Sequence, residues 1–147
     1  MWEAAWPEVW DSAMSHTVVP ADPSRLEEQI RNATGSQERA ELLREFVGPT
    51  WRDFFGDTAF NEKYRAWRKA RFEAQRAEPP RTLADEPERR SLDELIPAWE
   101  AGLTKVITIP CRGEYTRIIG GSVLLVTEAT RIDPGRYADA LRTFART

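Results

Sequence analysis

The segment VITIPCRGEYTRIIGGSVLLVT, residues 106–127, decides the fold. Its β-branched and apolar runs predict three strands, at 106–109, 115–119 and 122–127. Gly120 and Gly121 separate the last two runs, and two glycines supply the positive φ angles of a two-residue hairpin turn. The run VLLV at 123–126 is apolar at every position, so we expect the third strand to be covered on both faces.

The chain on either side of this segment is predicted to form helices. Apolar residues recur at helical spacing over about 4–15, 26–33, 40–47 and 58–77, with a short helical turn at 51–55. Ser91 and Asp133 are N-cap residues of two further helices, the second with Tyr137, Leu141 and Phe144 facing inward. The first helix should start close to Pro7, because proline is tolerated in a first turn. Pro97 should kink or break its helix, and residues 17–19 are a candidate edge strand.

These elements predict an α+β fold. The mostly helical first two-thirds should pack on a small, mainly antiparallel sheet of three or four strands, with a C-terminal helix. A length of 147 residues fits one domain spanning 1–147. Residues 78–90 contain three prolines and few apolar side chains, which predicts an extended, flexible loop.

The scarcity of histidine and cysteine limits the chemistry. His16 and Cys111 are the only residues of their types, so a His/Cys zinc site and an intrachain disulfide are excluded. No dinucleotide fingerprint or Walker A loop is present, and we expect neither a cofactor nor a metal. No apolar stretch reaches the roughly 20 residues of a membrane span, and the N-terminus lacks the features of a secretory signal. The sequence therefore predicts a cytoplasmic protein without membrane contact.

The helix at 58–77 carries the main candidate site. The net charge of −3 argues against binding nucleic acid over the whole surface, yet residues 60–77 hold six basic residues against Glu62 and Glu73. One face of this helix combines cations with an aromatic ring, at Arg65, Arg68, Lys69, Phe72 and Arg76. We expect this face to point outward, and the face with Phe60, Tyr64, Trp67 and Ala74 to be buried. Such a surface suits an acidic protein partner, a nucleic acid, or simple solvation of a charged helix.

A second candidate site surrounds the single cysteine. Cys111 and Arg112 lie in the connection before the second strand, and Tyr115 and Arg117 point to the same side of that strand. An arginine beside a thiol lowers its pKa, and an arginine on a half-buried sheet face requires an anion. This cluster would line the mouth of a pocket for an anionic or aromatic substrate, with His16 as the sole imidazole able to serve as a base.

Two functions of different classes follow. The first is a non-catalytic interaction or regulatory module, of the adaptor, antitoxin or immunity type, because six tryptophans and many arginines suit an interface. Its partner would be another protein, docked on the basic helix face; a nucleic acid and homodimerisation are alternatives. The second is a small enzyme that uses the cluster around Cys111.

Overall fold

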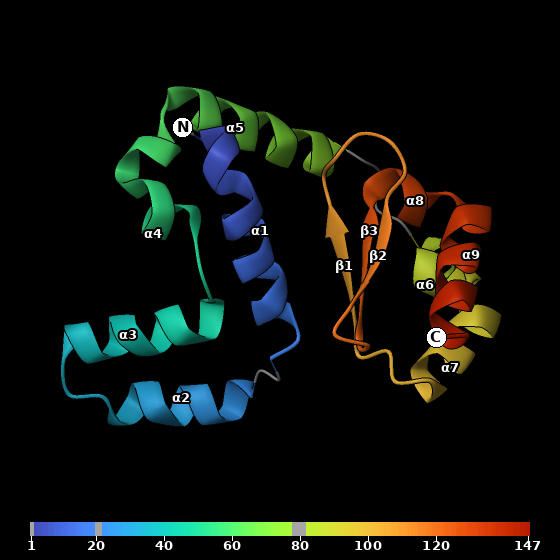
Figure 1. The fold of residues 1–147 in the computed structure, drawn as a ribbon, viewed down its shortest axis with the longest axis horizontal. Coiled ribbons are helices and arrows are strands. Elements are labelled where there is room, and N and C mark those ends of the chain that lie inside the picture. Colours follow the sequence, from blue (N-terminus) through green and yellow to red (C-terminus); the bar gives the residue numbers. More distant parts are fainter. Residues whose placement is uncertain (1, 20–21, 78–81) are drawn as a thin grey trace. The chain divides into compact units, whose positions relative to one another are not determined.

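The computed structural model describes residues 2–19, 22–77 and 82–147, except for the side chains of residues 2, 51, 59 and 75. The chain divides into two compact units, Met1–Ala77 (unit 1) and Glu78–Thr147 (unit 2), each of which is described by itself. The α+β class predicted from the sequence is confirmed: the chain is mostly helical and has one small sheet, which lies in unit 2 (Figure 1).

The sheet has three strands in the order β1-β3-β2, namely β1 (Lys105–Ile109), β3 (Val123–Thr127) and β2 (Thr116–Ile119). β2 pairs antiparallel with β3, whereas β1 pairs parallel with β3, so the predicted small sheet is mixed and not purely antiparallel. The connection 110–115 carries the chain from β1 at one edge of the sheet to β2 at the other edge. β3 then returns between them, antiparallel to β2 and therefore parallel to β1. The most apolar strand thereby lies between two neighbours, and all five of its residues are buried.

The hairpin between β2 and β3 contains the glycine pair, but three residues, 120–122, lie between the paired Ile119 and Val123 where the sequence predicted a two-residue turn. Gly120 and Gly121 have φ angles of 55° and 70°. Two consecutive positive φ angles match the right-handed twist of the paired strands. This turn fixes the register that places Ile119 opposite Val123 and Ile118 opposite Leu124.

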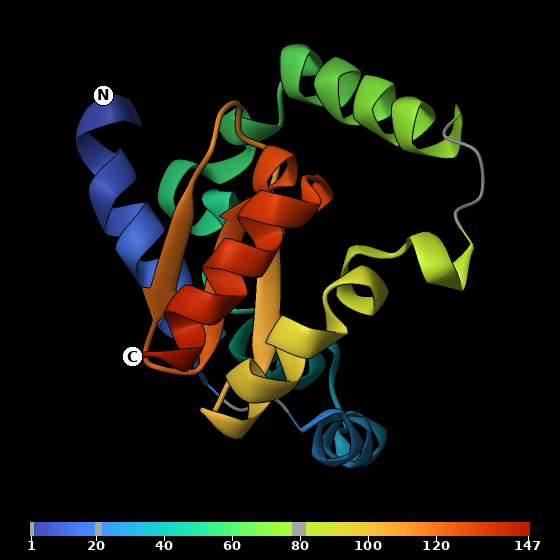
Figure 2. The same cartoon turned by 90° about the vertical axis from the view of Figure 1, so that its right-hand side faces the viewer.

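Two helices cover one face of the sheet. α7 (Leu92–Glu100) and α9 (Pro134–Ala145) pack against Leu124 and Val126 of β3, and Figure 2 shows α9 lying across this face. The inward positions predicted for α9 are confirmed, since Tyr137, Leu141 and Phe144 are buried. Each such side chain contributes roughly 1.5–3 kcal/mol to folding, so this cluster is the main source of stability in unit 2.

Several short elements of unit 2 depart from expectation. Residues 83–85 form the 3-10 helix η2 (Leu83–Asp85), residues 87–90 form α6 (Pro87–Arg90), and α8 (Glu128–Ile132) follows β3 directly. The extended loop expected over 78–90 is therefore helical in these two short stretches, while residues 78–81 lie outside the described residues. α7 continues through Pro97, which is exposed, so the predicted break at this proline does not occur.

Unit 1 is built from α1 (Trp2–Thr17), α2 (Pro23–Asn32), α3 (Ser36–Val47), α4 (Trp51–Phe55), η1 (Gly56–Phe60) and α5 (Glu62–Ala77). α1 begins before the predicted start and holds Pro7 in its interior. Residues 17–19 end α1 and form a turn, in which the Val19 amide donates to the His16 carbonyl, so the predicted edge strand is wrong.

Apolar stripes in unit 1 are less buried than their spacing predicts. On α3, Leu43 is 46% exposed and Val47 is 62% exposed, although both were expected to face inward. α2 and α3 contain no buried residue. Helical periodicity predicts which side chains share a face, but burial also requires a second surface that covers the face. Among the described helices, none has both the length and the apolar character to cross a bilayer.

Candidate functional site

A groove rich in positive charge lies along α5, the long green helix of Figure 1. The sequence forms this helix because the Asn61 side chain accepts a hydrogen bond from the Tyr64 amide at 3.0 Å, which caps the N-terminus. The helix therefore starts at Glu62, four residues after the predicted Thr58, which belongs to η1. The hollow measures about 740 Å³. We call it the basic groove; it is lined by Arg52, Phe60, Tyr64, Arg65, Arg68, Lys69, Arg71 and Phe72.

Aromatic rings form the apolar part of the basic groove. Phe60 and Tyr64 make an edge-to-face pair with ring centroids 5.2 Å apart, and the Arg52 guanidinium lies 4.7 Å from the Phe60 centroid. Phe72 is 58% exposed and lies 5.5 Å from the Arg76 guanidinium. A large exposed ring among cations is typical of a surface that anchors a partner.

Two of the cations that line the basic groove lack an ion pair among the described residues. Arg52 pairs with Asp57 at 3.0 Å, and Lys69 approaches Glu73 at 3.8 Å, but both contacts are exposed and therefore weak. Arg65 and Arg68 are exposed and have no ion-pair partner within the described part of the chain. The described lining contains no carboxylate. Arg65 and Arg68 are therefore the groove cations most available to an anionic group.

The structure brings together most of the basic cluster predicted from the sequence. Arg65, Arg68, Lys69 and Phe72 line the groove, whereas Arg76 lies beyond it against Phe72. Phe60 and Arg52 come from η1 and α4, and sequence spacing on α5 alone could not include them. The opposite face is not buried as expected, because Trp67 is 53% exposed and Ala74 is exposed.

The predicted cluster around Cys111 lies on the surface of unit 2. Cys111, Arg112, Tyr115 and Arg117 are all exposed in the connection to β2 and on β2 itself. The Tyr115 amide is held by Thr127 Oγ1 at 3.2 Å, so the backbone here is tied to the end of β3. The lone cysteine belongs to unit 2 and the lone histidine to unit 1.

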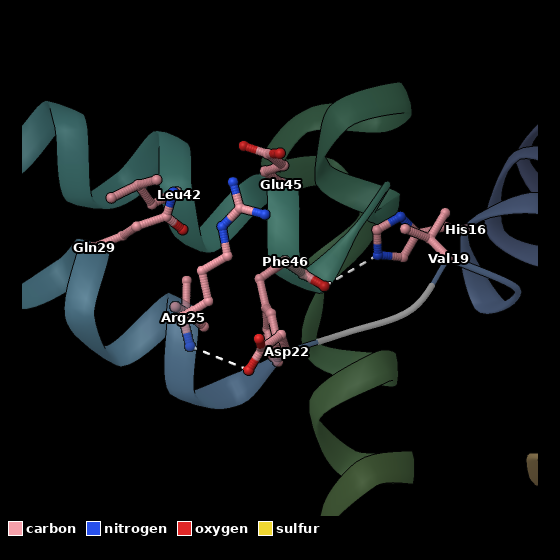
Figure 3. A pocket seen from close by; sticks show the side chains of 9 residues that line it. His16, Val19, Asp22, Arg25, Gln29, Leu42, Glu45 and Phe46 are labelled. Carbon is pink, nitrogen blue, oxygen red and sulfur yellow. Dashed lines mark hydrogen bonds between the residues drawn. The ribbon is translucent and has the colours of Figure 1, made fainter.

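His16 borders a smaller hollow of about 200 Å³ between α1, α2 and α3 (Figure 3). Its Nε2 lies 3.0 Å from the Phe46 carbonyl oxygen. The ring lies so close to Gly48 that a Cβ there would come within 2.2 Å of it. Asp22, also in this hollow, already accepts the Ser24 and Arg25 amides as the N-cap of α2. These groups are engaged in local structure, so we assign this hollow no chemistry.

Unit 2 contains a partly buried polar cluster that the sequence analysis did not predict. Arg131 donates two hydrogen bonds to Glu88, at 2.9 and 2.7 Å, and the Tyr137 hydroxyl donates to the same carboxylate at 3.1 Å. The cluster joins α6 to α8 and α9. Glu88 lies in the segment expected to be mobile, which concealed its role. Tyr137 was the residue that could have indicated the cluster, because its side chain was predicted to face inward and a buried tyrosine hydroxyl usually has a hydrogen-bond partner.

The pKa shifts of this cluster run in the directions expected of an ion pair with a hydrogen-bonded tyrosine. Burial alone would raise the pKa of Glu88, but the hydrogen bonds and charge of Arg131, with the Tyr137 hydroxyl, hold it below the ordinary 4.5. Burial and the charge of Glu88 together raise the pKa of Tyr137 above its ordinary value of 10.0. Neither shift brings a group close to neutral pH, as a general acid or base requires.

Two further findings bear on function. No three His, Cys, Asp or Glu side chains within residues 2–19, 22–77 and 82–147 gather as metal ligands would. Comparison of the chain with protein-family models, with curated proteins and with solved structures gives no match.

Proposed function

We propose that the chain is a non-catalytic protein-interaction module whose basic groove binds an acidic segment of a partner protein. The observation that carries this proposal is the groove itself: five cationic side chains and three rings line it, with no carboxylate in the described lining. Cations would attract and orient the acidic segment, while Phe72 and Tyr64 would contact its apolar side chains.

The charge distribution favours an acidic protein segment over a nucleic acid. The chain as a whole has a net charge of −3, which opposes the approach of a long polyanion. Acidic side chains on α2 and α3, such as Glu27 and Glu41, are exposed in the same unit as the groove. A short segment that combines carboxylates with an apolar anchor fits a localised basic groove better than a continuous phosphate backbone does.

The test uses the full chain and defined probes. A fluorescent peptide of Glu, Leu and Trp is titrated with the wild type, beside its Gln counterpart and a labelled oligo(dT) strand. We expect the acidic peptide to bind, and Arg65→Glu/Arg68→Glu to weaken it at least about tenfold, because attraction becomes repulsion at two positions. Phe72→Ala should weaken binding by a similar factor through loss of the apolar anchor.

A matched control separates the groove from general charge. Arg89→Glu/Arg90→Glu makes the same change in net charge on α6, where both residues are exposed, and should leave the affinity unchanged. Equal loss in both double variants, or equal binding of the acidic and the Gln peptide, would contradict the proposal. Tighter binding of oligo(dT) than of the acidic peptide would replace the protein partner with a nucleic acid.

A further inference from the structure

A row of apolar side chains on α7 faces away from the core of unit 2. Leu92, Ile96 and Trp99 are 40%, 47% and 59% exposed. Their spacing of four and then three residues places them on one side of the helix. We call this row the α7 ridge. An exposed tryptophan that continues an aliphatic row is typical of a docking surface, because no other element of unit 2 covers it.

The ridge is rigidly presented. Leu95 and Ala98, on the adjoining side of α7, are buried in the core with Leu124 and Tyr137. Arg142 of α9 donates to Glu94 at 2.6 Å and fixes the orientation of the helix further. The ridge therefore needs little ordering before it binds, which lowers the entropic cost of association.

Two carboxylates border the ridge. Asp93 and Glu100 are exposed and lie seven residues apart on the solvent side of Ile96. At 1.5 Å per residue this separation is about 10.5 Å along the helix. In the basic groove and directly beyond it, Lys69 and Arg76 flank Phe72 at the same spacing of seven residues. The α7 ridge, with its two bordering carboxylates, is therefore chemically complementary to Phe72 with its two flanking cations.

We propose that the acidic segment bound by the basic groove is the α7 ridge of a second copy of this chain. This inference rests on the proposed function and identifies the protein that binds the basic groove as a second copy of the chain. Trp99 and Ile96 pack against Phe72 and Tyr64, while Asp93 and Glu100 meet the groove cations. Pairing of ridge with ridge is disfavoured, because it would bring the carboxylates of both copies together. Each chain carries one ridge, in unit 2, and one groove, in unit 1, so a second copy supplies a complementary surface for each.

The experiment reverses charge on each side and then recombines the variants. The groove variant is Arg65→Glu/Arg68→Glu, and the ridge variant is Asp93→Arg/Glu100→Arg. We expect wild-type chain to sediment as a dimer at high concentration and as a monomer on dilution, because helix-sized contacts are small. Each variant alone should be monomeric, since like charges then face each other. An equimolar mixture should recover the dimer, because both contacts in the mixed pair are complementary.

Controls keep the outcomes distinct. Glu27→Arg/Glu28→Arg makes the same change in charge as the ridge variant, on exposed positions of α2, and should leave the dimer intact. Trp99→Ser tests the apolar part and should weaken the dimer at least about tenfold. A wild type that stays monomeric at every concentration, or a mixture that does not recover the dimer, overturns this inference. If the groove still binds the acidic peptide in that case, the proposed function stands; if it does not, both fail.

Discussion

The two units of the chain use similar amphipathic helices with different results. In unit 2, Leu124 and Leu141 are completely buried, because α7 and α9 have a sheet to pack on. In unit 1, α2 and α3 contain no buried residue, and Leu43 and Val47 remain exposed. The comparison teaches that an amphipathic sequence is sufficient for a helix, whereas a core requires a second surface of matching extent.

The same contrast separates stability from binding. Unit 2 combines a buried apolar cluster with the polar cluster of Glu88, Arg131 and Tyr137. Among its described residues, unit 1 has few buried apolar side chains, namely Val9, Met14 and Ala33, and its helices carry local caps, such as Asp22 on α2. A surface that stays open in the folded state is available to a partner, and the basic groove is such a surface.

The largest expected effect tests whether unit 2 alone holds a core. Leu141→Ala should lower the free energy of unfolding by about 2–5 kcal/mol, because it leaves a cavity in a fully buried cluster. Leu43→Ala makes the same change on α3, where the side chain is 46% exposed, and should cost less than about 1 kcal/mol. Urea denaturation followed by far-UV circular dichroism measures both. Equal losses would show that unit 1 has a core of its own and would remove the contrast.

The sequence predicted unit 2 better than unit 1. Strand positions, the positive φ angles of Gly120 and Gly121 and the inward side of α9 follow from short-range rules, and the structure confirms them. Strand order could not be predicted, because the connection 110–115 is compatible with pairing β1 to either of its successors. In unit 1, periodicity predicted the position of α3 but not how far its side chains are buried. No local sequence signal shows whether another element will pack over an apolar face.

The candidate site shows the same limit. Spacing on one helix was enough to group Arg65, Arg68, Lys69 and Phe72, because residues three and four apart share a face. Arg52 and Phe60 lie on separate short elements, and their approach depends on the turn at Gly56, which has a φ of 58°. The role of Glu88 depends on contacts more than forty residues away in sequence. Such contacts carry no periodic signature.

An intermediate effect tests the polar cluster that distinguishes unit 2. Glu88→Gln should lower the free energy of unfolding by about 1–3 kcal/mol at neutral pH, since it removes the charge that accepts two bonds from Arg131. The native pKa of Glu88 lies below 4.5, so its stabilisation is complete above that pH and declines as the pH falls through the native pKa. The gap between wild type and variant should therefore close in acid.

Denaturation at a series of pH values measures that gap. Tyr137→Phe is the matched control, because it removes one hydrogen bond to the same carboxylate and keeps the ion pair. It should cost about 0.5–1.5 kcal/mol. A gap between wild type and Glu88→Gln that stays constant from neutral to acid pH would show that the carboxylate charge does not stabilise unit 2.

The smallest expected effect concerns the groove cations. Arg65→Gln/Arg68→Gln should change the free energy of unfolding by less than about 0.5 kcal/mol, because both side chains are exposed and no described carboxylate pairs with them. Arg142→Gln in unit 2 is the contrasting case, because that guanidinium bonds both Glu94 and Asp139, and its loss should destabilise the chain. Thermal melts at low salt give both values. If the groove variant lost as much stability as Arg142→Gln, its arginines would serve the fold of unit 1 instead of remaining available for an anionic partner.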